Sequence, residues 1–156
     1  MKITCGIYLF NTLNEKFLIC HATKSKNYWS IPKGIKESQE DVFQAALREL
    51  FEETNIDLQN IKVITLHQLP PVKYEKQKKT LMSFIVIAEF PLNEIELKCH
   101  SKVDGKFPEI DKYKWVDIKE LQSLIHKTQT KNVKMIKSIT QKPIPFPSQF
   151  SSNGRV

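Results

Sequence analysis

The stretch of sequence that decides the fold runs from residue 34 to residue 56 and reads GIKESQEDVFQAALRELFEETNI. Between Ser38 and Thr54 the apolar residues recur at spacings of three and four, at Val42, Ala45, Ala46 and Leu50. This periodicity predicts an amphipathic helix over residues 38–54, and Ser38 is the residue expected to cap it. The other elements of the fold are predicted around this helix.

Three glutamates on the predicted helix stand where their carboxylates can meet. Glu49, Glu52 and Glu53 occupy positions i, i+3 and i+4, so they share one face. Unpaired, they would repel one another, whereas a hard divalent cation such as Mg²⁺ is commonly held by a few carboxylates, water and phosphate oxygens. Arg48 can pair with one of these carboxylates and fix its orientation. The alternative for such a helix taken alone is a solvated acidic face.

The spacing of these residues resembles the Nudix box, GX5EX7REUXEEXGU, in which U is a bulky aliphatic residue. Gly34 is followed after five residues by Glu40 and after seven more by the segment 48–56, RELFEETNI. The one departure is Asn55 in place of glycine, and asparagine is the best tolerated substitute where a helix ends in the left-handed conformation. The resemblance implies an α/β fold, the Nudix α/β/α sandwich with a mixed central β-sheet.

The resemblance also implies a metal site built on this helix. Glu52 and Glu53 match the principal metal ligands of the family, and Glu49 matches a residue described as a ligand or as the general base. The backbone carbonyl of Lys33, which comes just before the box glycine, matches a further metal contact. The expected cofactor is Mg²⁺, with Mn²⁺ as a substitute.

Other acidic residues receive supporting roles by the same resemblance. Arg48 is expected to orient Glu49, and Glu40 to support the loop or a second metal. The segment 107–115, FPEIDKYKW, is similar to the acidic, tryptophan-containing segment near the end of many members. Glu109 is therefore the candidate for an additional metal ligand outside the box, with Asp111 in reserve.

The substrate implied by the resemblance is a nucleotide that contains a phosphoanhydride. Segment 29–34, WSIPKG, is similar to the approach seen in members of the diadenosine polyphosphate type. Tyr74, 18 residues past Ile56, resembles a base-stacking tyrosine of those enzymes, while Pro71, 15 past Ile56, resembles a mark of the ADP-ribose-cleaving subgroup. Because segment 29–34 agrees with Tyr74, diadenosine polyphosphates are expected first, nucleoside triphosphates second and ADP-ribose-like compounds third.

Several side chains are candidates for binding this substrate. Trp29 could stack on a base, although packing is the simpler role for it. Lys33 and the lysines at 73, 76, 78 and 79 could hold phosphates by point charges, with Lys73 among the candidate binding residues. The alternative for the lysine-rich stretch is a solvated turn.

The charge and composition of the chain limit the partners. The 156 residues carry a net charge of +7, which favours anionic partners such as free nucleotides or RNA. Two alternative functions remain open: removal of the 5′ pyrophosphate or cap from RNA, and a non-catalytic module that senses a nucleotide. No apolar run approaches the roughly 20 residues needed to span a bilayer, and no secretory signal is recognised. A cytoplasmic protein without membrane partners is expected, and the oligomeric state is left open.

The remaining elements follow from runs of β-branched and aromatic residues. Strands are expected at 3–10, 16–21, 61–68, 80–90 and 113–116, and further helices at 118–126 and 131–139. Residues 21–34 and the connection after Pro70 are expected to be loops. A single domain over residues 1–141 and an irregular or flexible C-terminal tail over 142–156 follow, because three prolines lie close together after Gln141. The three cysteines, Cys5, Cys20 and Cys99, are expected to be reduced and buried.

Overall fold

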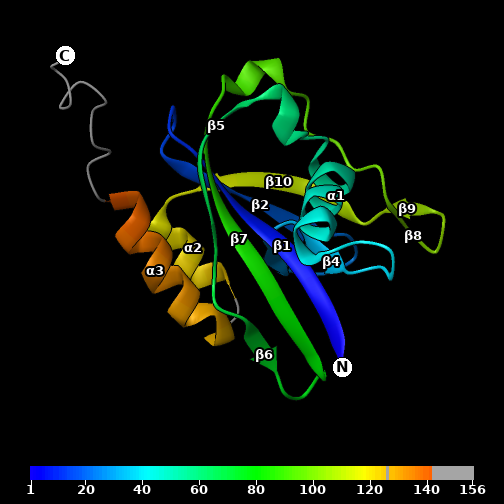
Figure 1. Ribbon diagram of the computed structural model, residues 1–156. Helices are drawn as coiled ribbons and strands as arrows, with labels where there is room; N and C mark the ends of the chain where they lie inside the picture. Colours follow the sequence, from blue (N-terminus) through cyan, green and yellow to red (C-terminus); the bar gives the residue numbers. More distant parts are fainter. Residues whose placement is uncertain (126, 142–156) are drawn as a thin grey trace, which may run out of the picture.

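A computed structural model describes residues 1–125 and 127–141, and its centre is a mixed, eight-stranded sheet (Figure 1). Five strands run in the spatial order β10-β2-β1-β7-β5, namely β1 (Lys2–Asn11), β2 (Lys16–Ala22), β5 (Lys62–Gln68), β7 (Lys79–Glu89) and β10 (Ile110–Val116). The central pair, β1 and β7, is parallel, and every other pair is antiparallel. The predicted mixed sheet is confirmed.

Short strands extend this sheet at the ends of the long ones. They are β3 (Trp29–Ser30) beside β2, β4 (Lys33–Ile35) beside β1, and β6 (Val72–Tyr74) beside β7. A separate hairpin pairs β8 (Lys102–Val103) with β9 (Phe107–Pro108). Three short 3₁₀ turns join the elements: η1 (Leu58–Asn60), η2 (Leu92–Glu94) and η3 (Lys127–Gln129).

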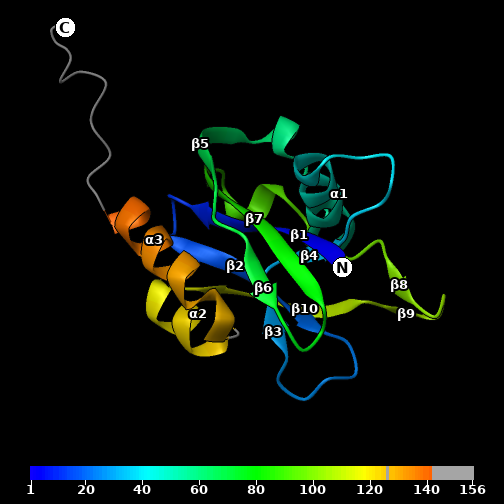
Figure 2. The same cartoon turned by 60° about the horizontal axis from the view of Figure 1, so that its bottom comes forward.

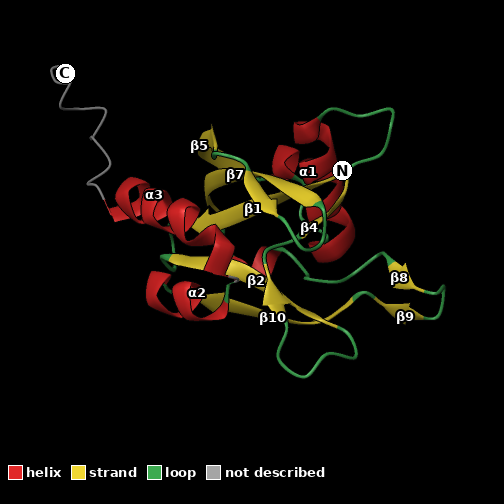
Figure 3. Ribbon diagram, turned by 90° about the horizontal axis from the view of Figure 1, so that it is seen from below, coloured by secondary structure: helices red, strands yellow, loops and turns green. Residues whose placement is uncertain are grey.

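Helices cover both faces of the sheet, which gives the predicted α/β/α sandwich (Figure 3). Helix α1 (Val42–Thr54) lies on one face, and α2 (Ile118–Leu124) and α3 (Thr130–Gln141) lie on the other. The alternation of side chains along β1 explains both layers, because successive residues of a strand point to opposite faces. Cys5, Ile7 and Leu9 join the core under α1, whereas Tyr8 and Phe10 join the core under α2 and α3.

Helix α1 begins four residues later than the sequence pattern predicted. Asp41, and not Ser38, is the N-cap: its side chain accepts a hydrogen bond from the Gln44 backbone N–H at 2.8 Å, and the Gln44 side chain accepts one from the Asp41 N–H at 2.9 Å. This reciprocal capping box satisfies two free N–H groups, and Ser38 cannot form one because Asp41, not Glu or Gln, stands three residues after it. The C-terminal end of α1 agrees with the prediction, since Asn55 adopts the left-handed conformation with a φ of 69°.

Two predicted loops contain paired strands. Residues 21–34 include β3 and part of β4, and the stretch after Pro70 forms β6, in which Val72 and Tyr74 are buried against Leu81 of β7. The prediction of an exposed loop is therefore wrong for this segment. His126 and the predicted tail 142–156 lie outside the described residues. Cys5 and Cys20 are buried free thiols as expected, but Cys99 is partly exposed.

The sequence predicted that no segment of the chain spans a membrane. Within residues 1–125 and 127–141, no helix is long and apolar enough to cross a bilayer.

Candidate active site

Two of the three predicted glutamates are buried where α1 packs against β4. The side chain of Glu49 presses against the backbone of Gly34, and a Cβ added to Gly34 would lie 2.2 Å from the carboxyl carbon of Glu49. Glu53 Oε1 accepts a hydrogen bond from the backbone N–H of Lys33 at 3.2 Å. Glu49 is 8% exposed and Glu53 is 5% exposed. The box glycine is thus required because only its bare backbone leaves room for the Glu49 carboxylate.

Burial disfavours the ionised form of both carboxyl groups. It raises the pKa of Glu53 to about 8, an effect to which the nearby carboxylates of Glu49 and Glu109 add. Burial likewise raises the pKa of Glu49 to about 7, against the opposing effect of Arg48, while Glu52 and Glu109 raise it further. Carboxylates with such raised pKa values favour a proton or a cation in their midst.

Arg48 links the helix to the loop before it. Its guanidinium donates two hydrogen bonds to Glu40, at 2.9 and 2.7 Å, and holds the pKa of that carboxyl at about 2. The same group donates to Glu49 at 2.8 Å, to Glu52 at 3.1 Å and to the carbonyl oxygen of Ile35 at 3.0 Å. Arg48 therefore orients Glu49 and Glu52, and Glu40 anchors Arg48. The predicted role of Glu40 at a second metal stays a prediction.

The three helix glutamates do not form a ready-made metal cluster. Within the described part of the chain, no three His, Cys, Asp or Glu side chains converge closely enough to hold an ion as they stand. The reason is that Glu52 turns toward Arg48, while Glu53 turns toward Lys33. The donor set nevertheless suits a hard divalent cation, because Glu49 and Glu53 are oxygen donors whose buried charge is only partly neutralised.

A pocket in front of Glu53 shows which of the two candidate acids lies near the buried glutamates: Glu109, just before β10, or Asp111, within it. Glu53 and Glu109 line this pocket together with Lys33, Tyr28 and Cys20, and we call it the acid pocket. Asp111 does not line it, because its carboxylate lies 2.6 Å from Nδ1 of His21. Of the two, Glu109 is therefore the acid that faces the buried glutamates.

A second pocket adjoins the acid pocket and contains Tyr74, one of the residues predicted to stack on a base. Tyr28 and Lys33 line both pockets, and Tyr74 and Lys79 line the second one. Tyr28 is 50% exposed, and the Lys33 ammonium lies 5.8 Å from the centre of its ring. Tyr74 is only 8% exposed, and its hydroxyl accepts a hydrogen bond from Gln129 at 2.8 Å.

The other candidate substrate-binding residues lie apart from the carboxylates. Trp29 packs with its ring edge toward His21, the ring centres being 5.0 Å apart, and is partly buried against the core. Lys73 is exposed on β6. Substrate contacts by these residues stay predictions.

The structure assigns supporting positions that the sequence did not indicate. The His21–Asp111 pair joins β2 to β10 next to the acid pocket, and the hydroxyl of Tyr113 donates to the backbone carbonyl of Glu53 at 2.5 Å. Tyr28 forms the shared wall of the two pockets. No spacing rule finds such contacts, because their partners are far apart in the chain and meet only through sheet pairing or through the packing of α1 on the sheet.

Comparisons with known proteins agree with this geometry. The profile of the NUDIX domain matches residues 2–139. The RNA pyrophosphohydrolase of Pelagibacter ubique is 31% identical over 136 residues, which cover 77% of this chain and 78% of that protein. The asymmetrical bis(5′-nucleosyl)-tetraphosphatase of Caenorhabditis elegans is 28% identical over 126 residues, covering 78% of this chain and 90% of that protein.

A solved structure supports the fold. The C. elegans Ap4A hydrolase in a binary complex has a TM-score of 0.68 at 20% identity, covering 87% of this chain and 96% of that one. The chain has the same sandwich, and its helix α1 buries two carboxylates beside Gly34. The chain belongs to the Nudix family, and it is a pyrophosphohydrolase of that family.

Proposed function

We propose that this protein hydrolyses a phosphoanhydride bond of a 5′-polyphosphorylated nucleotide with the help of Mg²⁺, or of Mn²⁺ in its place. The observation that carries the proposal is the pair of buried carboxylates, Glu49 and Glu53, held against the backbone of residues 33–34 with too little positive charge around them. We also propose that the protein is cytoplasmic, as the sequence predicts.

Each residue of the site has its own role in the proposed hydrolysis. Mg²⁺, when bound, supplies positive charge that neutralises phosphate oxygens. Glu53, Glu109 and Glu52 are the residues that would hold the ion, together with the backbone carbonyl of Lys33. Glu49 takes a proton from the attacking water, a role that its pKa of about 7 suits at neutral pH. Arg48 keeps the Glu49 carboxylate in position, and the ammonium of Lys33 attracts the remaining phosphates.

The substrate class that we place first is the 5′-triphosphate end of RNA, from which pyrophosphate would be released. Support comes from the relative in P. ubique, whose name is RNA pyrophosphohydrolase. It also comes from Tyr74, since a ring only 8% exposed with a bound hydroxyl offers little surface for base stacking. In the sequence, Tyr74 favoured diadenosine polyphosphates as the first substrate class, and its burial reverses that order.

The second substrate class is the diadenosine polyphosphates. The C. elegans relative named as a bis(5′-nucleosyl)-tetraphosphatase favours them, and so does the exposed ring of Tyr28 beside Lys33, which could stack on an adenine. Nucleoside triphosphates and ADP-ribose share the same chemistry and belong in the same test.

The experiment is a substrate panel with the purified chain. Triphosphorylated RNA, diadenosine tetraphosphate, ATP and ADP-ribose are incubated with Mg²⁺, with Mn²⁺ or with EDTA, and products are identified by mass. We expect pyrophosphate and monophosphorylated RNA, formed only when metal is present. Binding of these compounds without any product would instead establish a non-catalytic nucleotide sensor.

A further inference from the structure

The positive charge of the chain is concentrated in two segments. Residues 72–79 and 127–141 together contain eight lysines and one acid, Glu75, and so have a net charge of +7, which equals the net charge of the whole chain. The other residues therefore balance to zero. We call these eight side chains the lysine surface: Lys73, Lys76, Lys78, Lys79, Lys127, Lys131, Lys134 and Lys137.

The two segments lie side by side in the fold. The turn η3, which leads into α3, contacts β6, and Gln129 of η3 donates a hydrogen bond to the Tyr74 hydroxyl at 2.8 Å. Figure 2 shows β6 and α3 on the same side of the molecule. Seven of the eight lysines are exposed and Lys79 is partly so. No ion pair between described residues involves any of them, so their charge is not neutralised within the described chain.

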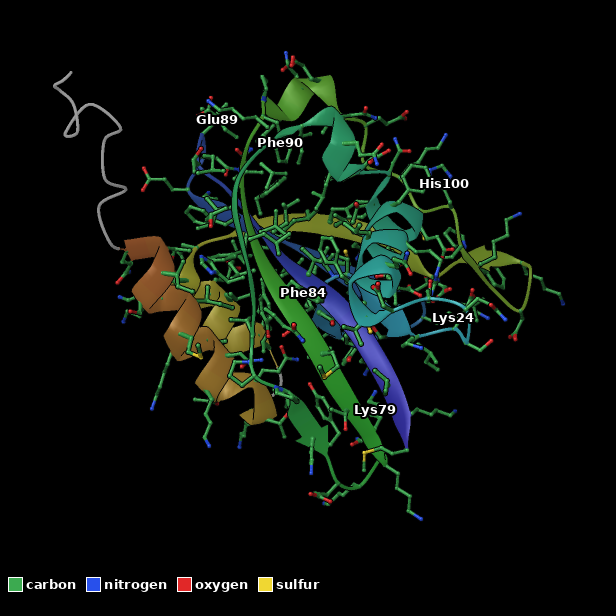
Figure 4. All side chains as sticks on the ribbon, viewed as in Figure 1. Lys24, Lys79, Phe84, Glu89, Phe90 and His100 are labelled. Carbon is green, nitrogen blue, oxygen red and sulfur yellow. The ribbon has the colours of Figure 1, made fainter. Side chains whose placement is uncertain are left out.

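The lysine surface reaches the catalytic site through the second pocket. Lys79, labelled in Figure 4 at the start of β7, lines that pocket with Gln77 of the β6–β7 turn. Lys33 and Tyr28 line it as well, and both also line the acid pocket that contains Glu53. A chain that enters the acid pocket at one end can thus continue past Lys33 to the turn and on to α3.

We infer that the lysine surface binds the phosphate backbone of an RNA whose 5′ end occupies the acid pocket. The inference rests on the proposed function and adds to it a binding surface outside the catalytic site. A row of lysines without acidic partners gains affinity for a polyanion by releasing its counterions, and it does so without reading sequence. The exposed ring of Tyr28, where the two pockets meet, is placed to stack on a base near the 5′ end.

An acidic membrane is the other polyanion that could meet such a surface, but α3 lacks the side chains for it. Helices that lie in a membrane interface insert an apolar face beneath their lysines. The apolar residues Val133 and Ile136 of α3 are instead buried in the protein core. The exposed face of α3 is made mainly of lysines and small polar residues, which suits a solvated phosphate chain.

Three double variants, each removing two positive charges, test the inference by binding. Lys131→Gln with Lys134→Gln changes α3, Lys76→Gln with Lys78→Gln changes the turn, and Lys16→Gln with Lys62→Gln is the control at exposed positions elsewhere. Fluorescence anisotropy measures affinity for a labelled single-stranded RNA of about 20 nucleotides with a 5′ hydroxyl, at several salt concentrations. We expect the first two variants to lose about tenfold in affinity at low salt and to make the salt dependence shallower by roughly one unit of slope. Equal behaviour of all three variants would overturn the inference.

Kinetics separate this inference from the proposed function. The Lys131→Gln, Lys134→Gln variant should hydrolyse a triphosphorylated dinucleotide at the wild-type rate, but lose roughly tenfold in kcat/KM on RNA of about 20 nucleotides. If both substrates are hydrolysed and neither responds to the variant, the inference is wrong while the function stands. If no substrate is hydrolysed, the function is wrong, and RNA affinity still decides the inference. Tight binding of the wild type to vesicles of anionic phospholipid, lost in the variants, with no RNA binding, would also overturn it.

Discussion

The two faces of the sheet both bury polar side chains, but in opposite ways. Under α2 and α3 a network of neutral groups is hydrogen-bonded: the Tyr8 hydroxyl donates to Gln129, and Gln129 donates to the Tyr74 hydroxyl at 2.8 Å. Under α1 the buried groups are the carboxyls of Glu49 and Glu53, whose pKa values are raised by burial and by neighbouring carboxylates. One face pairs neutral groups with each other, whereas the other face buries two acids whose ionised forms are disfavoured.

We infer that the face under α2 and α3 serves stability and that the face under α1 serves catalysis. A buried neutral network that is fully hydrogen-bonded stabilises the packing around it, whereas a buried charge without a sufficient partner costs stability. The α1 face therefore carries a cost that only binding or catalysis explains. Substitutions on the two faces should have opposite effects on stability and on turnover.

The largest effect is expected from Glu53→Gln. The substitution removes a proposed ligand charge and little volume, so kcat should fall by about 10³-fold. The free energy of unfolding of the metal-free protein should rise at neutral pH, since folding no longer requires this site to take up a proton. Activity assays and urea denaturation measure the two effects. The exposed Glu94→Gln is the control and should change neither; a Glu53→Gln protein with near wild-type turnover would remove α1 from the chemistry.

Gly34→Ala should reduce turnover by about 10²-fold, because the new Cβ would displace the Glu49 carboxylate that lies 2.2 Å from it. The matched control is Gly105→Ala, whose Cβ would meet nothing within 4 Å but whose backbone has φ +66°. That change should cost about 1 kcal/mol of stability by backbone strain and leave kcat unchanged. Equal losses of activity in both variants would show that the contact with Glu49 is unimportant.

The pH dependence of stability should reveal the buried acids directly. Their folded pKa values of about 7 and 8 lie above the ordinary value of 4.5, so protonation favours the folded state. Stability from this source is fully present below pH 4.5 and is lost as the pH rises toward 8. The loss in EDTA should be at least about 3 kcal/mol, the part that the Glu49 carboxyl alone contributes.

The control for this titration is again Glu53→Gln, in which the loss between pH 4.5 and 8 should be smaller, because only the Glu49 carboxyl then contributes. The Glu40 carboxyl acts in the other direction, because its pKa is lowered to about 2 by Arg48. Its contribution is present above pH 4.5 and is lost at lower pH. A wild-type protein whose stability stays flat from pH 5 to pH 8 would contradict the assigned charge states.

Gln129→Leu, on the other face, should give the smallest change in rate. It leaves the hydroxyls of Tyr8 and Tyr74 without their shared partner, which should cost about 2 kcal/mol of stability. The value of kcat should stay within about twofold, since the network does not touch the carboxylates. Thermal unfolding and initial rates measure both. A large loss of kcat at unchanged stability would mean that this network takes part in catalysis.

The sequence predicted the elements that have strong periodicity and the residues that belong to a fixed spacing. Helix α1 and the long strands were found in this way, because one apolar face repeats every 3.6 or every two residues. The link between Arg48 and Glu52 was predicted for the same reason, since positions four residues apart on a helix are neighbours. The helix start was misplaced because Ser38 and Asp41 are both good capping residues, and only the partner Gln44 distinguishes them.

Other parts of the site depend on pairing between distant strands. The choice of Glu109 over Asp111 follows from His21, which β2 brings to Asp111 across the sheet. Burial of Tyr74 follows from Gln129, which lies 55 residues away in sequence. No local pattern encodes these contacts, so base stacking by Tyr74 looked more favourable in the sequence than in the structure.

The parallel pairing of β1 with β7 has a consequence for how the chain acquires its structure during synthesis. Ten consecutive residues of β1, from Lys2 to Asn11, are paired with residues of β7, from Lys79 to Ala88. Closing so long a loop is slow, and on the ribosome it must wait until β7 has emerged from the exit tunnel. Until then an apolar strand stands with an unpaired edge, so the nascent protein should depend on chaperones more than its small size suggests.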